Sequence, residues 1–327
     1  MLGVGIIGGG RVAHAHARAT ATNGATLSLR GIAEVDPTRA AALGERYDCP
    51  TYTDYHALLA QPDIHMVTIA LPNVLHAPAA MDAIAAGKHV FVEKPMALTL
   101  DECDAMIAAA GKAGVKLMVG HTQHFFALNL AAHRLISEGQ LGPLATLTDT
   151  WYKPFGLHFR LPWFLDRAQG GGMWQMNGAH MVDRMLWFAS SPVVAVKAHI
   201  ANPLLKQGAD DTALAFLQHA NGLCSTIAHA GYRAGDERWE GEFVCADGMI
   251  RLSTFPPNAG LWVARSERYE PVEVAPNDAF SLEFELFARS ILDNTPEPIT
   301  PAYARHVVQV LLAAEESSRT GREVVIR

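Results

Sequence analysis

A glycine-rich turn placed directly after the first apolar run constrains the fold of this chain more than any other feature. The apolar run at residues 2–7 predicts a strand, and the turn at residues 8–13 has the form G-x-G-x-x-A. Between a strand and a helix, Gly8 allows a tight turn, Gly10 lets a pyrophosphate approach the backbone, and Ala13 lets helix and strand pack closely. The turn predicts a dinucleotide site at a helix N-terminus. A glycine turn without a ligand is the alternative.

The first 120 residues continue the alternation of β-rich runs and alanine-rich helical stretches. Further strands are expected at residues 26–33, 64–70, 89–92 and 115–119, and helices at residues 11–21, 36–47, 54–60, 76–86 and 99–111. Thr99 and Glu102 have the spacing of a capping box at the start of the last helix. This alternation implies right-handed crossovers and a parallel, doubly wound α/β sheet of the Rossmann type.

The pattern changes after Gly120, where strands follow one another without helices between them. Helices are expected at residues 122–139, 173–189, 279–293 and 302–319, and strands at residues 144–152, 193–200, 212–218, 222–231, 239–245, 248–253 and 261–265. Consecutive strands favour an α+β domain with a large, mainly antiparallel sheet. We therefore predict two domains, at residues 1–121 and 122–327, as the chain length also suggests.

An acidic residue follows the second predicted strand. Glu34 lies about 20 residues past the glycine turn, where a carboxylate can bond the ribose 2′-hydroxyl of a dinucleotide. Because a carboxylate there would repel a 2′-phosphate, NAD is expected in preference to NADP. Asp36 is the competing candidate for this contact, or it caps the next helix.

A lysine follows the predicted strand at residues 89–92, in the turn Glu93-Lys94-Pro95. Ligands of open α/β sheets bind beyond the carboxyl ends of the strands, and Pro95 biases Lys94 away from helical backbone angles. Desolvation at such a place would lower the pKa of the lysine and suit it to acid–base chemistry. A surface lysine in a turn is the alternative.

Together these motifs resemble the Gfo/Idh/MocA oxidoreductase family, which includes glucose–fructose oxidoreductase and inositol dehydrogenase. The matching segments span almost the whole chain and are the glycine turn with His16, Thr51-Tyr52-Thr53-Asp54-Tyr55, Pro62-Asp63, Pro72-Asn73, His76, Gly87-Lys88-His89-Val90, Glu93-Lys94-Pro95, Gly170-Gly171-Gly172, Gly178-x-His180-x-x-Asp183 and Ser317-x-x-Thr320-Gly321-Arg322. No single segment is specific, but the set is. The resemblance implies a Rossmann domain followed by a domain with a large, open antiparallel sheet.

The resemblance also implies roles for residues of the first domain. Lys94 is expected to contact both the nicotinamide ribose and the substrate hydroxyl, in a turn that often has a cis peptide in this family and closes the nicotinamide pocket. Asn73 and His76 are expected in the loop over the cofactor. The other cofactor contacts that we expect are Gly8, Gly10, Arg11, Val12, Glu34, Leu71, Glu93, Pro95 and Gln123.

A histidine and an aspartate lie three positions apart in the predicted helix at residues 173–189 and share one of its faces. Asp183 can orient the imidazole of His180 and stabilise its charge. The resemblance implies that His180 is an acid–base or substrate-binding residue facing the nicotinamide. A hydrogen-bonded histidine without such a role is the alternative.

The chain departs from the family pattern at two positions. Many relatives carry Asp or Asn four residues before this histidine, where the chain has Met176, which cannot transfer a proton. Either Asn177 takes a polar role, or Lys94 and His180 work without that partner. Relatives often have Arg at the position of His124. Both departures weaken the expectation of ordinary sugar or polyol recognition.

A loop rich in aromatic residues is expected at residues 151–174. Aromatic rings stack on sugars or flat rings, and Arg160 can hold a carboxylate. A packed loop or a subunit interface is an equally good interpretation. The other residues of interest in this loop are Trp151, Phe155, His158, Phe159, Phe164 and Trp174. The expected substrate contacts are Lys94, Tyr152, Arg160, Trp163, Met176, Asn177 and His180.

Charge and cysteine content limit the partners. The formal net charge of -7 argues against nucleic acid or an anionic membrane as the main partner, because both need clustered Lys and Arg. The four cysteines are far apart and no apolar run matches a membrane helix, so a cytoplasmic protein with reduced thiols is expected. No H-x-x-x-H or Cys/His cluster predicts a metal site. An exposed sheet face would be buried in a homodimer or homotetramer.

We predict an NAD(P)-dependent dehydrogenase that acts on the CH–OH group of a sugar, polyol or related small molecule by reversible hydride transfer, with Lys94 and His180 as catalytic residues. One alternative is an NAD-dependent glycosidase or lyase, which oxidises its substrate transiently and recycles the cofactor; Met176 favours it slightly. A non-enzymatic nucleotide-sensing protein is a further alternative, against which the presence of Lys94 and His180 argues.

Overall fold

The computed structural model describes residues 1–155, 160–206 and 208–326. His158 and Phe159 of the expected aromatic loop lie outside these ranges. In the described part, no helix is both long enough and apolar enough to cross a membrane.

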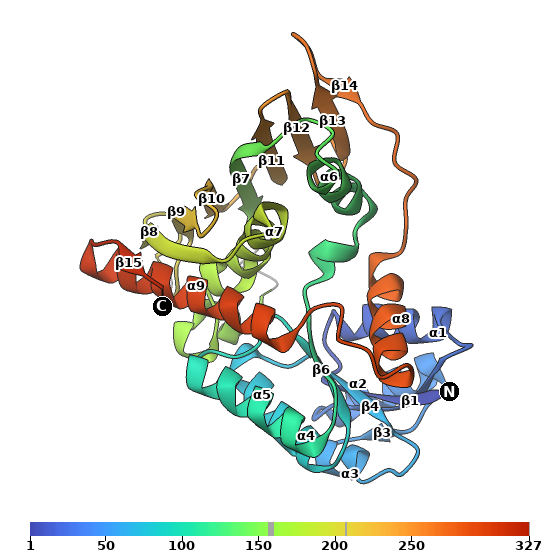
Figure 1. Cartoon of the computed structure of the whole chain (residues 1–327). Helices are drawn as coiled ribbons and strands as arrows, with labels where there is room; N and C mark the ends of the chain where they lie inside the picture. The colour runs from blue at the N-terminus through green and yellow to red at the C-terminus, as the bar shows by residue number, and fades with distance from the viewer. Residues whose placement is uncertain (156–159, 207, 327) are drawn as a thin grey trace. The chain divides into compact units, whose positions relative to one another are not determined.

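The chain forms two compact units, each built from two stretches of sequence (Figure 1). Met1–Thr122 and Asp278–Arg305 make up the first unit, and Gln123–Asn277 and His306–Arg327 the second. The two predicted domains were continuous and met at residue 121, so they differ from these units in where residues 278–305 belong.

The first unit contains a six-stranded, all-parallel sheet in the order β3-β2-β1-β4-β5-β6. Its strands are β1 (Leu2–Ile7), β2 (Leu27–Ala33), β3 (Thr51–Tyr52), β4 (Met66–Ile69), β5 (His89–Glu93) and β6 (Leu117–Gly120). This is the strand order of a Rossmann fold, so the predicted doubly wound α/β sheet is confirmed. The short strand β3 was not expected from the sequence.

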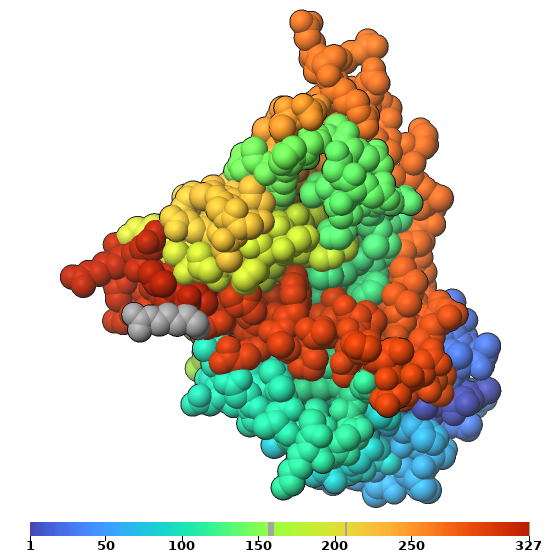
Figure 2. Space-filling model, viewed as in Figure 1, coloured from blue at the N-terminus to red at the C-terminus, as the bar shows by residue number. Residues whose placement is uncertain are grey.

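Helices connect these strands and cover the sheet (Figure 1). They are α1 (Ala13–Thr22), α2 (Pro37–Tyr47), α3 (Tyr55–Leu59), the 3₁₀ helix η1 (Asn73–Leu75), α4 (His76–Ala85), α5 (Leu100–Ala113) and, from later in the chain, α8 (Ala279–Leu292). Helix α8 packs on α1, which explains why residues 278–305 join the first unit. Helices α4 and α5 pack on each other and present their outer sides at the surface (Figure 2).

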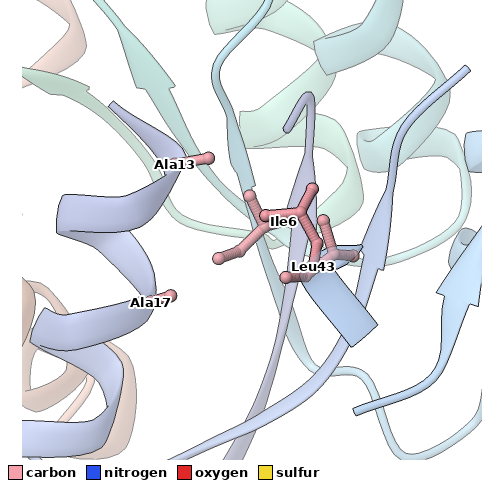
Figure 3. Packing of buried hydrophobic residues seen from close by; sticks show 5 residues of the cluster. Ile6, Ala13, Ala17 and Leu43 are labelled. Atoms are coloured by element: carbon pink, nitrogen blue, oxygen red, sulfur yellow. The ribbon is translucent and has the colours of Figure 1, made fainter. Parts of the chain in front are cut away.

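Small residues let α1 lie close to the sheet, as the last position of the glycine motif predicts. Ala13 and Ala17, one turn apart on α1, point at Ile6 of β1 (Figure 3). Leu43 of α2 packs into the same cluster, and all four side chains are buried. A larger side chain at residue 13 would push the helix away from the strand that carries the glycine turn.

Polar caps set the starts of two helices. Thr99 and Glu102 form the predicted capping box at the start of α5, with Glu102 also accepting from the backbone N–H of Thr99 at 3.0 Å. Asp36 accepts from the N–H groups of Thr38 and Arg39 at the start of α2. Each cap satisfies N–H groups that the first helical turn leaves without partners.

The second unit contains a nine-stranded sheet in the order β14-β13-β12-β11-β7-β10-β9-β8-β15. Its strands are β7 (Leu144–Pro154), β8 (Val193–Ala201), β9 (Thr212–His219), β10 (Cys224–Tyr232), β11 (Arg238–Cys245), β12 (Gly248–Ser253), β13 (Gly260–Ala264), β14 (Glu270–Pro271) and β15 (Val324–Val325). The central strands β7 and β10 pair in parallel, and the other neighbours pair antiparallel. The prediction of a large, mainly antiparallel sheet is thereby confirmed.

Burial alternates along the strands of this sheet, so one face is packed and the other is open. On β9, Ala213, Ala215 and Leu217 are buried, whereas Leu214 and Phe216 are 56% and 36% exposed. Apolar side chains on the open face distinguish it from an ordinary solvated sheet surface.

Two helices that the sequence predicts as single α-helices change their helix type along their length in the structure. The helix expected at residues 122–139 is a 3₁₀ helix, η2 (Thr122–Phe125), followed by α6 (Ala127–Ser137). The helix expected at residues 173–189 begins as a π-helix, η5 (Trp174–Gly178), and continues as α7 (Ala179–Ala189). The remaining helices are η3 (Pro162–Leu165), η4 (Arg167–Gln169) and α9 (Pro301–Thr320). Short π-helical turns are frequent at functional sites.

Candidate active site

The glycine turn after β1 has the geometry that a bound pyrophosphate requires. Gly8 has a φ of +99°, and its N–H donates to the carbonyl oxygen of Ala33 at 2.9 Å. A Cβ on Gly8 would lie 2.4 Å from the carbonyl oxygen of Ala70, so a larger residue does not fit. A Cβ on Gly10, in contrast, would meet no atom within 4 Å. The space that the motif reserves for a phosphate is therefore open.

The first turn of α1 lies beside this space. Arg11 is exposed and leads into the helix, and Val12 occupies its N-cap position without a side-chain hydrogen bond to it. No acidic residue stands in the first turn. Such a helix start, with its partial positive charge, is suited to an anion such as a pyrophosphate. The predicted cofactor contacts Gly8, Gly10, Arg11 and Val12 are thus brought together.

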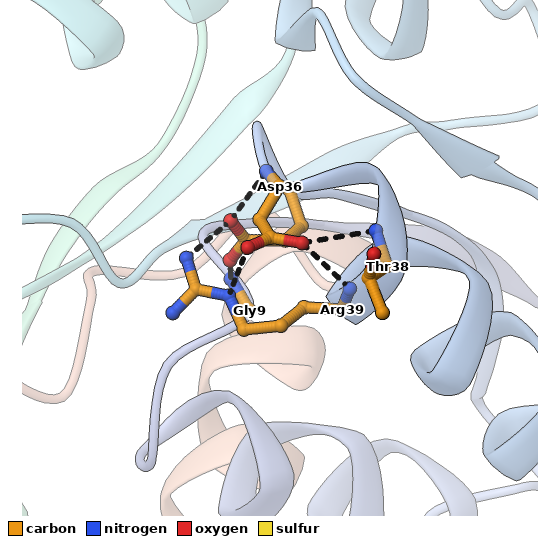
Figure 4. Close-up of polar contacts among 5 residues, drawn as sticks. Gly9, Asp36, Thr38 and Arg39 are labelled. Atoms are coloured by element: carbon orange, nitrogen blue, oxygen red, sulfur yellow. Dashed lines mark hydrogen bonds and ion pairs between the residues drawn. The ribbon is translucent and has the colours of Figure 1, made fainter.

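Glu34 lies beneath the turn and holds it through hydrogen bonds. Its carboxylate accepts from the backbone N–H of Gly9 at 3.0 Å and from the backbone N–H of Asp36 at 3.0 Å. Arg39 donates to the same carboxylate at 2.7 Å and its Nε lies 3.9 Å from the carboxylate of Asp36 (Figure 4). The acidic residue expected at the ribose is therefore part of the glycine-turn network, and Asp36 has the helix-capping role that we also considered.

His76 joins the loops that follow β4 and β5. Its Nδ1 lies 2.8 Å from the carbonyl oxygen of Pro95, and its Nε2 lies 3.0 Å from the carbonyl oxygen of Leu71. Complete burial lowers the pKa of His76, in spite of these two carbonyl contacts. Asn73, which is expected over the cofactor, is buried at the start of η1, directly after the loop that follows β4. His76 thus ties together the segments that carry Leu71, Asn73 and Pro95.

Lys94 is half-buried in the turn after β5, and the Lys94–Pro95 peptide is cis. The preceding residue, Glu93, lies 2.9 Å from Nε2 of His16, whose Nδ1 is 3.2 Å from the hydroxyl of Thr68. His16 is fully buried and belongs to α1. One hydrogen-bond chain therefore fixes the Lys94 turn to the helix that starts at the glycine turn.

The charge of Glu93 is stabilised by its neighbours. Burial raises the pKa of its carboxyl group, but the hydrogen bond and charge of His16, with the charges of Lys94 and His76, outweigh burial and lower it overall. The carboxylate of Glu93 is therefore stabilised in its ionised form next to the turn that carries Lys94. Only β4 separates β1 from β5, so the glycine turn and Lys94 are about 10 Å apart along the carboxyl edge of the sheet.

The second unit places its candidate residues at the π-helical turn before α7. Met176 and Asn177 lie in the turn, and His180 follows in the first turn of α7. Asn177 is buried, and its amide nitrogen has no hydrogen-bond partner among the described residues. A buried donor without a partner is costly, so this amide is suited to donate to a ligand.

Aromatic side chains of the packed sheet face surround His180. The indoles of Trp151 and Trp239 stack in parallel at 4.1 Å, and the ring of His180 lies 6.3 Å from each. His229 stacks on Trp151 at 5.7 Å and is fully buried. Burial, with the charge of Lys153, lowers the pKa of His229 to about 3. Both of its ring nitrogens are without hydrogen-bond partners among the described residues.

A buried ion pair lies behind the indoles. Arg184 and Asp149, both fully buried, are 3.4 Å apart, and the indole of Trp239 donates to the same aspartate at 2.9 Å. The guanidinium carbon of Arg184 lies 4.4 Å from the centre of the Trp239 ring. These contacts fix the plane of Trp239 and, through stacking, that of Trp151.

Asp183 binds a histidine other than the one that its sequence spacing suggests. Its carboxylate lies 2.7 Å from Nε2 of His124, 59 positions away in the chain. The imidazole of His124 stacks on Trp187 at 4.2 Å, and His133 stacks on the same indole at 4.3 Å. The position at which the resemblance led us to compare His124 with Arg therefore contributes a buried histidine to a partly exposed aromatic stack.

The remaining predicted substrate contacts lie on the loop side of β7. Tyr152 is half-buried near the end of β7, and Trp163 packs on Phe164 at 4.0 Å. Arg160 donates from Nε to the carbonyl oxygen of Phe155 at 2.5 Å, and its guanidinium lies 4.9 Å from the Phe164 ring. Arg160 is thus held by its own loop, as expected of a packed loop.

Gln123, a predicted cofactor contact, is buried in the second unit, where its side-chain and backbone oxygens accept from Asn129. Among the described residues, no cluster of three His, Cys, Asp or Glu side chains is arranged to hold a metal ion.

Three residues that shape these sites were not predicted as site residues. Arg39 holds Glu34, His16 holds Glu93, and His229 lies in the aromatic group around His180. The pairing of His16 with Glu93 joins residues 77 positions apart, so no local spacing could reveal it. The Glu34–Arg39 spacing of five was a local signal, because a residue at the end of a strand can meet the first turn of the next helix.

Comparison with known proteins matches both units to one family. The model described as "Oxidoreductase family, NAD-binding Rossmann fold" matches residues 2–121. The model described as "GFO/IDH/MocA C-terminal domain" matches residues 129–251. The two models follow each other along the chain in the order that the resemblance implies.

Several enzymes of known name are similar to this chain. A 1-carboxy-3-chloro-3,4-dihydroxycyclohexa-1,5-diene dehydrogenase from Comamonas testosteroni is 32% identical over 55% of this chain and 45% of its own length. An NAD-dependent scyllo-inositol 2-dehydrogenase from Bacillus subtilis is 23% identical over 98% of this chain and 94% of its own. The crystal structure of aldose-aldose oxidoreductase from Caulobacter crescentus, complexed with glycerol, aligns with a TM-score of 0.87, 26% identity and 99% of each chain.

Proposed function

Because the chain belongs to the Gfo/Idh/MocA oxidoreductase family, with an NAD-binding Rossmann fold, we propose that Lys94 and His180 catalyse reversible hydride transfer between NAD and a hydroxyl-bearing carbon of a sugar, polyol or related small molecule. One observation carries the assignment of Lys94. Its turn is fixed on both sides, by His16 through Glu93 and by His76 through Pro95. A lysine carried by a turn fixed in this way, at the carboxyl edge of a Rossmann sheet, is suited to the geometry of the reaction.

The residues of the first unit would bind the cofactor. The phosphates would lie against Gly10 and the start of α1, where a Cβ would meet no atom, and Glu34 would face the adenine ribose. The cofactor, when bound, supplies the hydride chemistry at its nicotinamide. Lys94 takes the hydroxyl proton during oxidation of the alcohol and returns it during reduction.

The residues of the second unit would bind and orient the substrate. Asn177 offers a buried N–H donor to a substrate oxygen, in place of the acid that Met176 replaces. His180, with indoles on its flank, offers a second proton carrier or a hydrogen bond to the reacting hydroxyl. Trp151 and Trp239 limit the room beside it, so a compact ring is the expected shape of the substrate.

A dehydrogenase screen tests the proposal. The whole protein is incubated with NAD or NADP and a panel of cyclic polyols, aldoses and hydroxy acids, and the absorbance of the reduced cofactor is recorded. Sustained formation of NADH with a cyclic polyol or sugar is expected. Tight binding of NAD without turnover of any hydroxyl compound would favour the nucleotide-sensing alternative instead.

Met176 favours a second candidate reaction. Its thioether cannot transfer a proton, so this turn departs from the pattern of the ordinary dehydrogenases. Transient oxidation of the substrate, followed by elimination and return of the hydride, is therefore the second candidate. Product formation without net accumulation of NADH would identify this reaction.

We also propose that the chain forms a homodimer or homotetramer in the cytoplasm. Leu214 and Phe216, exposed on the open face of the second sheet, support an interface between subunits there. The four cysteines are free thiols, which suits a reducing compartment. Light scattering of wild-type protein and a Leu214→Lys variant tests the interface: the variant should dissociate, and an unchanged mass would contradict it.

A further inference from the structure

A pocket of about 520 Å³ lies on the outer side of α1 in the first unit. Arginines from three places line it: Arg11 from the glycine turn, Arg18 from α1 and Arg46 from the end of α2. Val12, His14, Ala15 and Phe280 complete the wall. The volume falls within the range of small-molecule sites. We call this pocket the arginine pocket.

The positive charge of the arginine pocket is not neutralised within the unit. In the described part of the chain, Arg11, Arg18 and Arg46 form no ion pair with a carboxylate, whereas Arg305, for example, pairs with Asp104. All three are exposed. Three like charges converge here although the protein as a whole has a net charge of -7. Their mutual repulsion would be relieved by a bound anion.

The wall beside Arg46 is fixed by aromatic and hydrogen-bond contacts. Nδ1 of His14 lies 2.6 Å from the hydroxyl of Tyr47, and the guanidinium of Arg46 lies 5.5 Å from the Tyr47 ring. Burial, and then the charges of Arg46 and Arg18, lower the pKa of His14. His14 is therefore neutral near neutral pH, and the three guanidinium groups supply the charge of the pocket.

The arginine pocket extends away from the expected cofactor phosphates. Arg11 and Arg18 are seven positions apart, which is about 10 Å along a helix. The end formed by Arg11 and Val12 adjoins the glycine turn, and neither Glu34 nor Arg39 lines the pocket. Arg18 and Arg46 are therefore free to bind a second anion without touching the cofactor.

We propose that the arginine pocket binds a phosphate-bearing small molecule, and that this ligand weakens cofactor binding. A guanidinium group can donate two parallel hydrogen bonds to the oxygens of one phosphate, and three guanidinium groups line this one pocket. The bounded volume and the net negative charge of the protein favour a small ligand over a polyanion. The weakening rests on the proposed function, because Arg11 adjoins both the pocket and the turn that would hold the cofactor pyrophosphate.

Titration calorimetry of the whole protein with inorganic pyrophosphate tests the binding. Pyrophosphate should bind the arginine pocket in addition to any that the glycine turn takes, and the binding by the pocket should weaken at least about tenfold in the Arg18→Gln/Arg46→Gln double variant. Arg30→Gln, a change at an exposed arginine outside the pocket, is the matched control and should stay within about twofold of wild type. Equal binding by the wild type and the double variant would overturn the proposal.

Titration of NAD with and without saturating pyrophosphate tests the coupling. The dissociation constant of NAD should rise several-fold with pyrophosphate in the wild type and change little in the double variant. Without pyrophosphate, the double variant should bind NAD as the wild type does. If it loses NAD affinity as strongly as pyrophosphate affinity, the pocket belongs to the cofactor site and the inference is wrong. If wild type binds pyrophosphate but no NAD, the proposed function fails and the pocket assignment stands.

Phenyl phosphate distinguishes an organic phosphate ester from an inorganic phosphate as the ligand. If phenyl phosphate binds more tightly than inorganic phosphate and Phe280→Leu removes the difference, the pocket takes an ester whose ring contacts Phe280. Equal affinities that Phe280→Leu leaves unchanged indicate that the phosphate group alone is bound. Failure of both compounds to bind would overturn the proposal.

Discussion

The glycine turn of the first unit and the π-helical turn of the second both offer groups to a ligand, but they are built in different ways. The glycine turn presents backbone and open space, and its polar support, Glu34 and Arg39, comes from the next strand and helix. The π-helical turn presents the side chain of Asn177, and His180 follows it in α7 with indoles from distant strands beside its ring.

This difference matches two kinds of ligand. A pyrophosphate has the same shape in every dinucleotide, so a turn of fixed backbone geometry recognises it. Substrates differ in the positions of their hydroxyl groups. Side chains, which can be substituted one at a time, therefore determine which substrate is bound. Changes in the first region should therefore alter cofactor binding, and changes in the second should alter the substrate and the pH response.

Removal of the Lys94 amine should give the largest effect. In Lys94→Ala, kcat should fall by about 10³-fold, because proton transfer loses its positioned group, while the dissociation constant of NAD stays within a few-fold. Steady-state kinetics and NAD titration measure the two quantities. Lys112→Ala, at an exposed lysine in the last turn of α5, is the control and should keep full activity. Retained turnover in Lys94→Ala would remove the residue from the mechanism.

Filling the space beside Gly10 should separate binding from stability. Gly10→Val places a side chain where a Cβ now meets no atom within 4 Å, so the melting temperature should change little. NAD affinity should fall by about 100-fold, because the branched side chain occupies the place of the pyrophosphate. Gly8→Ala is the matched contrast: its Cβ would lie 2.4 Å from a carbonyl oxygen, and it should destabilise the fold. Wild-type NAD affinity in Gly10→Val would contradict the assigned phosphate position.

The buried histidine of the second region should give a pH effect on stability. The pKa of His229 is about 3 in the folded chain and 6.5 when unperturbed, so the unfolded chain binds the extra proton between these values. The free energy of unfolding therefore decreases as the pH falls below about 6.5. At about pH 4.5 it should be roughly 2–3 kcal/mol lower than at neutral pH because of this residue.

Substitution of His229 by Phe should remove this part of the pH dependence. Urea unfolding of the wild type and of His229→Phe, at about pH 6.5 and about pH 4.5, measures this pH dependence. The free energy of unfolding should decrease more in the wild type than in the variant. His199→Phe, at an exposed position of β8, should keep the wild-type slope. Parallel curves for wild type and His229→Phe would show that His229 titrates normally.

Exchange of Glu34 should give the smallest of these effects. In Glu34→Ser, the carboxylate that would repel a 2′-phosphate is lost and Arg39 is released to bind that phosphate. The ratio of NADP to NAD affinity should rise about tenfold, measured by titration of both cofactors. Glu45→Ser on the outside of α2 should leave the ratio unchanged. A fixed ratio in Glu34→Ser would place the adenine ribose elsewhere.

The sequence by itself determined those features whose cause is local. The alternation of strands and helices, the glycine turn and the capping box of α5 follow from backbone periodicity and from residues within a few positions of each other. The Rossmann fold, the mainly antiparallel second sheet and the family could therefore be predicted. The π-helical turn could not, because one extra residue per turn leaves no mark in the spacing of apolar residues.

Only the tertiary structure decided which distant groups meet. His16 reaches Glu93, Asp183 reaches His124, and Trp239 reaches Asp149 because sheet order and helix packing place them side by side. The same packing puts α8 on α1 and so moves residues 278–305 into the first unit. Hydrogen bonds between residues so far apart depend on the whole fold. The spacing of three within one helix predicted that Asp183 orients His180, but it could not predict that Asp183 contacts His124, which comes from another element.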